Sequence, residues 1–367
     1  MRQAQLFRLP MSGPSDVSAI KDLIETKKIS ASEIIAVLGK TEGNGCVNDF
    51  TRGFAVQSLQ LLLRQYLDEA ELKGIGITIS GGTEGGLSPH WLVFTAREIE
   101  ATENMQRRRK SLAFGIADTP SIKPWELGRL HQVNAVSVAV QKAMKQAGIS
   151  DPNDVHFVQI KCPLLTSDQT SQTYSGHTTV TQDTLKSMGF SRGASALGVA
   201  LALGELDPND VADDDIGQNH SLYSTKASCS AGVELDYCEI LVMGMSNDWI
   251  GDLHINHGVM QDAIDVEPLI SILSPIRNGD RFQLNKDEQK DVIAVLAKAE
   301  ASISGDIRGH RHTMLNDSDV SSTRHARGFT GGAIAAVIGH TSLFVSGGAE
   351  HQGPDGGGPI AAIYKMS

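Results

Sequence analysis

Short runs of apolar residues, rich in β-branched side chains, alternate along the chain with polar segments. They include IIAVLGK at 34–40, GIGITIS at 74–80, VHFVQIK at 155–161 and EILVMGMS at 239–246. Continuous apolar runs of this length, bounded by turn residues, are typical of buried β-strands. We therefore predict a buried strand at each of these positions.

Longer segments carry apolar residues at the spacing of a helix face. Residues 18–28, 54–67, 133–149 and 196–205 have this pattern, and we also predict a helix for KDVIAVLAKAE at 290–300. Predicted strands and helices interleave from one end of the chain to the other. The pattern therefore indicates a mixed α/β protein.

One composite motif appears three times and divides the chain. Each copy has an apolar run ending in Lys, then Arg-Gly opening a helix-like stretch, then an apolar run ending in Ser-Gly or Ser-Ala. Because repeats define architecture, we predict homologous α/β domains over 1–103, 112–250 and 255–367, related by pseudo-threefold symmetry around one central site. The polar stretch at 104–111 is expected to be a solvated linker, and 167–182 an insertion loop.

The composition is that of an ordinary globular protein. The chain has 367 residues, of which 40% are hydrophobic and 20% charged, and its net charge is −11. The negative charge argues against nucleic acid as the main partner. No apolar stretch is long enough to cross a bilayer, residues 1–30 lack the pattern of a secretory signal, and the four cysteines form no disulfide framework. We therefore expect a cytoplasmic protein with reduced thiols and no membrane partner.

The repeated residues carry chemistry rather than packing. They are three lysines, three arginines and three serines with a small residue after each: Lys40, Arg52, Ser80 and Gly81; Lys161, Arg192, Ser230 and Ala231; Lys298, Arg327, Ser346 and Gly347. A neutral lysine can act as the base that activates a serine hydroxyl, and burial and nearby positive charge both favour the neutral form. Arginine can bind carbonyl or imide oxygens, and a backbone N–H beside a small residue can bind an oxyanion. We therefore predict a Ser–Lys dyad in a shared pocket.

Other motifs are weaker. GKT at 39–41 resembles the end of a phosphate-binding loop, but position 34 is Ile where that loop needs Gly. Cys162 and Cys229 adjoin motif residues, yet neighbours in a strand point to opposite faces, so we interpret both as structural. The histidine pairs at 310 and 312 and at 254 and 257 lack a matching carboxylate, and no catalytic metal is expected.

The glycine-rich segment at 347–359 admits two interpretations. Its carbonyl oxygens could surround a hard cation together with one carboxylate such as Glu300. Alternatively, the segment is a plain loop rich in turns. The residues alone do not decide between the two.

Long motifs resemble the cyanuric acid hydrolase and barbiturase family of ring-opening amidohydrolases. GKTEGNGCVNDFTRG, SGGTEG, HFVQIKCPLL, SRGASALG, SAGVEL, AKAEAS and VSGGAEHQGP carry this resemblance, which runs from about residue 5 to the C-terminus, and details such as HFVQIKCPLLT are most similar to the cyanuric acid hydrolases. The resemblance implies three repeat domains around one active site, no catalytic metal and a homotetramer. It also implies a small cyclic imide as substrate, opened to carboxybiuret, which decarboxylates to biuret.

The resemblance also assigns roles to residues. It implies that Ser230 attacks a ring carbonyl with Lys161 as its base, and that Ser80, Ser346, Lys40 and Lys298 hold the other two carbonyls. It further implies a structural magnesium or calcium ion held by residues of the third domain: Glu300, Ala349, Gln352, Gly353, Pro354 and Gly357. Repeat symmetry by itself does not say which serine attacks.

Two alternatives stay open. Barbituric acid also presents three carbonyls, and its rejection would need a hydrogen-bond acceptor that the sequence does not locate. A binder of cyclic ureides without catalytic activity could use the same scaffold. An assay of ring opening with both acids side by side separates these possibilities.

Overall fold

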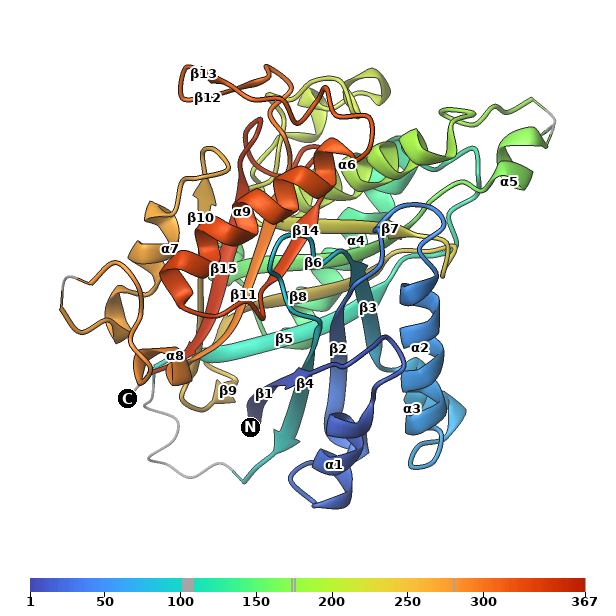
Figure 1. The fold of residues 1–367 in the computed structure, drawn as a ribbon. Coiled ribbons are helices and arrows are strands. Elements are labelled where there is room, and N and C mark those ends of the chain that lie inside the picture. The colour runs from blue at the N-terminus through green and yellow to red at the C-terminus, as the bar shows by residue number, and fades with distance from the viewer. Residues whose placement is uncertain (101–108, 173, 175, 280, 367) are drawn as a thin grey trace.

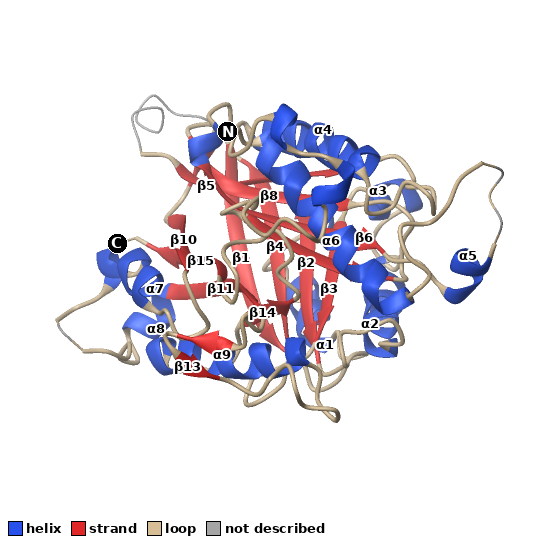
Figure 2. Ribbon diagram, turned by 90° about the horizontal axis from the view of Figure 1, so that it is seen from above, coloured by secondary structure: helices blue, strands red, loops and turns tan. Residues whose placement is uncertain are grey.

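A computed structural model describes residues 1–100, 109–172, 174, 176–279 and 281–366. Its main elements are three sheets of β-strands with helices around them (Figures 1 and 2). Most of the predicted linker at 104–111 lies outside the described residues, and Ser111 already begins a strand.

The first sheet comes from the N-terminal part of the chain. Its strands lie in the order β3-β2-β4-β1, with the short strand β9 added beside β1. The strands are β1 (Arg2–Pro10), β2 (Ile34–Thr41), β3 (Gly76–Gly81), β4 (His90–Glu98) and β9 (Trp249–Ile250), and the helices are α1 (Ser18–Glu25), α2 (Phe50–Leu63) and α3 (Glu69–Lys73). The sequence pattern predicted β2, β3, α1 and α2, although α2 begins before residue 54.

The second sheet repeats this order as β7-β6-β8-β5. Its strands are β5 (Ser111–Asp118), β6 (Val155–Pro163), β7 (Ala227–Gly232) and β8 (Glu239–Ser246), and its helices are α4 (Leu130–Ala147), α5 (Ser167–Ser171) and α6 (Thr184–Ala202). The predicted strands at 155–161 and 239–246 are confirmed, as are the helices at 133–149 and 196–205, the second of which is part of the longer α6.

The third sheet has the order β14-β11-β15-β10. Its strands are β10 (Leu253–Met260), β11 (Val292–Ala299), β14 (Phe344–Gly347) and β15 (Gly358–Lys365), and its helices are α7 (Glu267–Ile272), α8 (Glu288–Asp291) and α9 (Ser322–Ile338). A small hairpin of β12 (Asp306–Ile307) and β13 (His310–Arg311) lies between β11 and α9. In each sheet the two strands nearest the β3, β7 or β14 edge run parallel.

The helix predicted over 290–300 is wrong. Only Glu288–Asp291 is helical there, and Val292–Ala299 is strand β11, paired with β14 on one side and β15 on the other. The segment VIAVLAKA is apolar on both faces, because it lies inside the sheet and is covered on both sides. Periodicity cannot separate such a strand from a buried helix.

Alternating side chains of the central strands enter different cores. In the first sheet Leu38 belongs to a core shared by strands of all three sheets, whereas Val37 packs toward α1 and α2. In the third sheet Leu296 lies in the shared core and Val295 packs toward α7 and α9. The sheets therefore meet through their inner faces, and helices cover their outer faces.

Candidate active site

Each motif lysine lies directly opposite a motif serine. The parallel strand pairs place Lys40 opposite Ser80, Lys161 opposite Ser230 and Lys298 opposite Ser346. All six residues are near the carboxyl ends of their strands, and all six are buried. Side chains directly opposite in neighbouring strands project from the same face of a sheet. Each sheet therefore presents one lysine and one serine together.

The three serines meet at one point. The Ser230 and Ser346 hydroxyl oxygens are 2.9 Å apart, and the Ser80 hydroxyl donates to that of Ser346 at 3.5 Å. These contacts join residues from three different sheets. The structure therefore brings together the side chains that sequence analysis assigned to a shared pocket.

The lysine ammonium groups link neighbouring sheets. Lys161 Nζ donates to the carbonyl oxygen of Ile79 in the first sheet at 2.9 Å, and Lys298 Nζ donates to that of Cys229 in the second sheet at 2.8 Å. Lys40 and Lys298 also donate to the hydroxyls of their paired serines, at 3.2 and 3.4 Å. Among the described residues, Lys161 has no such hydrogen bond to Ser230.

Burial changes the charge state of these lysines. It lowers the pKa of Lys161 to about 8 and that of Lys298 to about 7, and it holds the pKa of Lys40 well below its usual range. Nearby arginines act in the same direction: Arg52 on Lys161, Arg192 on Lys298 and Arg327 on Lys40. Neutral lysine is thus accessible near neutral pH at all three positions. The pKa alone does not single out Lys161, because that of Lys298 is lower.

The cysteines next to the motif residues are structural. Cys162 and Cys229 are fully buried, and burial raises the pKa of both thiols. A thiol under these conditions stays protonated and is a poor nucleophile. The expectation that neither cysteine is reactive agrees with this environment.

Each arginine comes from the helix that follows the lysine strand and reaches a glutamate of another sheet. Arg327 forms a bidentate pair with Glu84, and Arg192 with Glu350, with hydrogen bonds of 2.6 and 2.8 Å in each pair. Arg52 Nε lies 3.2 Å from Glu234. The pairs connect the third sheet to the first, the second to the third and the first to the second. The three pairs therefore link the three sheets in a closed ring.

Sequence analysis missed the three glutamates. Each lies four residues after a motif serine, in Ser80-Gly-Gly-Thr-Glu84, Ser230-Ala-Gly-Val-Glu234 and Ser346-Gly-Gly-Ala-Glu350. This constant spacing was the available signal. It changes the interpretation of the arginines, since Arg192 and Arg327 direct two of their donor atoms to glutamate. Their Nη1 atoms have no hydrogen-bond partner among the described residues and remain available to a ligand.

The small residues after the serines differ for a steric reason. A side-chain carbon at Gly81 would collide with the carboxylate of Asp49, and one at Gly347 would collide with the methyl group of Thr323. Ala231 is buried without such a collision, and its carbonyl accepts a 2.7 Å hydrogen bond from Arg52. Glycine is therefore required at two of the three positions and not at the third.

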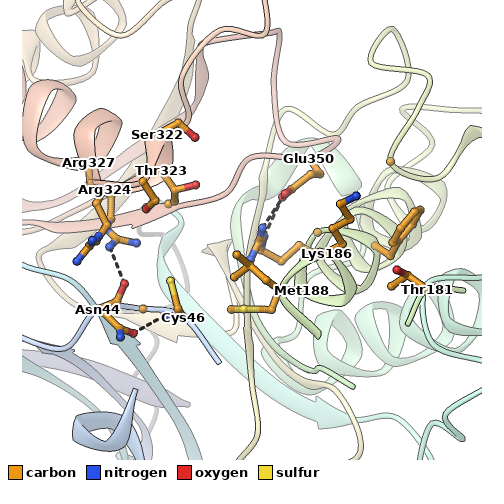
Figure 3. A pocket seen from close by; sticks show the side chains of 18 of the residues that line it. Asn44, Cys46, Thr181, Lys186, Met188, Ser322, Thr323, Arg324, Arg327 and Glu350 are labelled. Carbon is orange, nitrogen blue, oxygen red and sulfur yellow. Dashed lines mark hydrogen bonds and ion pairs between the residues drawn. The ribbon is translucent and has the colours of Figure 1, made fainter. Parts of the chain in front are cut away.

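A cavity of about 670 Å³ lies beside the motif residues. Its lining includes Arg192, Arg327, Gly347 and Glu350, whereas the motif serines are buried and do not line it. In Figure 3, Ser322, Thr323 and Arg324 lie across the cavity from Lys186 and Met188.

The suggested cation ligands gather beside this site. Glu300, Ala349, Gly353 and Pro354 line a cavity of about 260 Å³, together with Glu350. Gln352 uses its side chain to bind the loop, accepting from the Cys229 amide and donating to the Gly348 and Glu350 carbonyls. Gly357 does not line the cavity and donates its amide to the Pro354 carbonyl.

The carboxylates in this cavity suit a hard cation. Burial raises the pKa of Glu300, and the adjacent carboxylate of Glu350 raises it further. Two close carboxylates and backbone carbonyls are donors that Mg²⁺ or Ca²⁺ prefers. Within the described part of the chain no three His, Cys, Asp or Glu side chains cluster as metal ligands. A site built largely from carbonyl oxygens does not need such a cluster, so the residues fit the proposed ion.

Comparisons with known proteins agree over the whole chain. The profile of the family described as amidohydrolase ring-opening protein matches residues 5–365. A cyanuric acid amidohydrolase of Bradyrhizobium sp. (strain ORS 375) is 54% identical, covering 100% of this chain and 99% of the relative. One from Azorhizobium caulinodans is also 54% identical, with 98% of each chain covered.

Solved structures give the same result. The crystal structure of the cyanuric acid hydrolase from A. caulinodans superposes with a TM-score of 0.92 at 52% identity, covering 100% of both chains. A second cyanuric acid hydrolase structure has a TM-score of 0.93 at 47% identity and the same coverage. No helix in the described residues is both long and apolar enough to span a membrane.

Proposed function

Because the chain belongs to the ring-opening amidohydrolase family and is an amidohydrolase, we propose that it hydrolyses cyanuric acid to carboxybiuret, which loses carbon dioxide to give biuret. The observation that carries this proposal is the meeting of Ser80, Ser230 and Ser346 at one point, each with a buried lysine opposite. Cyanuric acid has three equivalent carbonyls and three N–H groups. A site with three matching sets of donors is complementary to that ring.

We propose that the three sheets are related by pseudo-threefold symmetry about the serines. Their identical strand orders and the closed ring of arginine–glutamate pairs support this arrangement. The domain limits 1–103, 112–250 and 255–367 remain predictions. Strand β9, at 249–250, pairs with the first sheet although it lies within the second range.

In the proposed reaction Ser230 attacks a ring carbonyl and its proton passes to Lys161. Backbone N–H groups near the Ser230-Ala231 junction hold the tetrahedral oxyanion. The ring C–N bond then breaks, and the departing nitrogen takes the proton from Lys161. Water hydrolyses the resulting ester at Ser230, which releases carboxybiuret and restores the hydroxyl.

The other two sets hold the ring. Ser80 with Lys40 and Ser346 with Lys298 would donate to the two spectator carbonyls, since their amines already reach their own serine hydroxyls. Arg192 and Arg327 would contribute their unpartnered Nη1 donors. Together these cationic groups favour the anion of an acidic imide.

We propose a structural Mg²⁺ or Ca²⁺ ion in the cavity beside Glu300, with carbonyl oxygens among Ala349, Gly353 and Pro354, which line it, as further ligands; Gln352 and Gly357 would hold the shape of the loop. When bound, such an ion supplies positive charge to the two neighbouring carboxylates of Glu300 and Glu350 and stiffens the glycine-rich loop. No step of the reaction depends on it. We also propose a homotetramer, which light scattering of the purified protein tests.

The deciding experiment follows ring opening of cyanuric acid and barbituric acid side by side, with detection of biuret. Turnover of cyanuric acid with biuret formation supports the proposal. Preference for barbituric acid would make the protein a barbiturase. Tight binding of either ring without turnover would indicate a binding protein.

A further inference from the structure

Glu234 makes a different contact from its two counterparts. Its carboxylate lies between Arg52 Nε, at 3.2 Å, and Lys161 Nζ, at 3.5 Å. Both of its oxygens are buried, and among the described residues neither has a hydrogen-bond partner. Glu84 and Glu350, by contrast, form bidentate hydrogen bonds to Arg327 and Arg192. Lys161 is, within the described chain, the one motif lysine with a carboxylate in ion-pair range.

The backbone explains the difference. After Ser80 and Ser346 the second following residue is a glycine with positive φ, Gly82 at +108° and Gly348 at +78°. These left-handed turns end the strand and pass close to an arginine. The corresponding Gly232 is the last residue of strand β7 and has no positive φ. The chain therefore leaves the second sheet in another direction.

Gly232 also makes room for the contact. A side-chain carbon at this position would lie 2.7 Å from Lys161 Nζ and would collide with the Glu234 carboxylate. The absence of a side chain lets the two groups approach. The same repeated motif thus directs its glutamate toward an arginine alone in two sheets, and toward both an arginine and the motif lysine in the second.

We propose that Glu234 is a positioning residue for Lys161, and that this contact makes the second sheet the one that carries the reaction. The inference rests on the proposed function. Glu234 and the carbonyl of Ile79 both contact the amine of Lys161, at 3.5 and 2.9 Å, and so restrict its position on the residue directly opposite Ser230. The contact also answers a question that repeat symmetry leaves open, namely which serine attacks.

The electrostatics agree with this role. Burial is the largest influence on Lys161 and lowers its pKa, while Glu234 raises it and Arg52 lowers it again. The result is a pKa of about 8, above the value of about 7 for Lys298. Glu239 on β8 lies opposite Lys161, Cys162 is the next residue on the same strand, and Asp49 lies 3.7 Å from Arg52. Glu234 therefore partly offsets the effect of burial on the pKa of Lys161.

The test compares the pH dependence of kcat/KM, corrected for ionisation of cyanuric acid, in the wild type and in Glu234→Gln. Removing the negative charge lowers the pKa of Lys161. We expect the ascending limb to move to lower pH by about 1 unit and the plateau to fall about tenfold or more. Glu84→Gln is the matched control: it can weaken binding, but the limb should stay in place.

A second variant, Glu234→Asp, keeps the inference testable if Glu234→Gln does not fold. Glu234→Asp keeps the charge and withdraws it from Lys161, so its limb should move in the same direction by a smaller amount. If the wild type opens the ring and the limb stays in place in the folded Glu234 variants, or moves equally in Glu84→Gln, the inference is wrong. If the wild type opens no ring, the proposed function fails instead.

Discussion

The second and third sheets share a strand order, but the lysine–serine pairs that they carry differ in their contacts. We call the pair Lys161 and Ser230 the Lys161 corner, and the pair Lys298 and Ser346 the Lys298 corner. Lys298 donates to its own serine and to the carbonyl of the next residue, at 3.4 and 3.1 Å. Both lysines donate to a carbonyl of a neighbouring sheet, but Lys161 contacts Glu234 in place of its own serine, and Ser230 is left to hydrogen-bond with Ser346. A single turn, left-handed at Gly348 and absent at Gly232, accompanies the change. Sheets with the same strand order can thus place their lysines in different chemical environments.

The largest expected effect comes from removing the reacting pair. Ser230→Ala and Lys161→Ala should each lower the single-turnover rate by roughly 10³-fold or more, and the double variant should be little worse because the two act as a unit. Ser80→Ala and Ser346→Ala should be milder at the chemical step. Equal losses at all three serines in single-turnover rates would remove the distinction between the corners.

Arginine substitutions test whether the pH dependence of the reaction reports the pKa of Lys161 or that of another lysine. Arg52 lowers the pKa of Lys161, whereas Arg192 and Arg327 act on the other two lysines. Arg52→Gln should therefore raise the pKa of Lys161 and move the ascending limb of kcat/KM to higher pH, by about 1 unit. Arg192→Gln should mainly raise KM.

Arg52→Lys is the control, since it keeps the positive charge and should hold the limb near its wild-type position. The pH–rate profile of all three variants is the measurement. A larger limb shift in Arg192→Gln than in Arg52→Gln would mean that the lysines titrate as one coupled group.

The residue after each serine gives a smaller effect on stability. Gly81→Ala forces a methyl group against the Asp49 carboxylate and should destabilise the fold by about 1–3 kcal/mol, a fall of several degrees in Tm. Ala231→Gly removes a methyl group that fits and should lower stability by less than about 1 kcal/mol. Thermal unfolding followed by circular dichroism measures both. The same change at both sites would show that the corners are sterically equivalent.

The smallest expected effect concerns β8, which pairs with the strand of Lys161 on the side away from Ser230. Glu239 on β8 lies opposite Lys161, and burial raises its pKa to about 8. A carboxyl whose pKa is raised by folding stabilises the protein at low pH, and this contribution is lost as the pH rises through about 8. The loss begins at the unfolded-state pKa of about 4.5, so Glu239→Gln should raise Tm by a few degrees at pH 9 and by a smaller amount at pH 6.

His90→Gln provides the matched control for that experiment. His90 is opposite Lys40 in the first sheet, and burial lowers its pKa to about 4, so it stays neutral throughout the alkaline range. Its replacement should change Tm by the same amount at pH 6 and pH 9. If the Tm of Glu239→Gln equals that of the wild type at both pH values, the assignment of a buried, protonated carboxyl is wrong.

Local patterns predicted much of the secondary structure and the shared pocket. Apolar runs ending in Lys identified strands β2 and β6, and the thrice-repeated Lys, Arg and Ser identified groups that the fold brings together. Strand β11 was mistaken for a helix because it is buried on both faces and has no alternation.

The contacts that the sequence could not predict are long-range. Arg327 and Glu84 are separated by 243 positions, and nothing local to either residue identifies its partner. The asymmetry at Glu234 depends on the φ angle of one glycine, and Gly-containing sequences at all three corners look alike. The proposed reaction came from the resemblance to a family. The strand registers and the burial of the lysines give physical reasons why these residues can carry it out.

The ring of arginine–glutamate pairs has a consequence for biosynthesis. Glu84 leaves the ribosome long before Arg327, and Arg192 long before Glu350, so early parts of the chain carry charges whose partners do not yet exist. A buried unpaired charge is strongly unfavourable, which should keep the inner ends of the first two sheets hydrated until β14 and the loop after it emerge. The pocket should therefore close near the end of translation. A stalled nascent chain would expose these charged ends to chaperones and proteases.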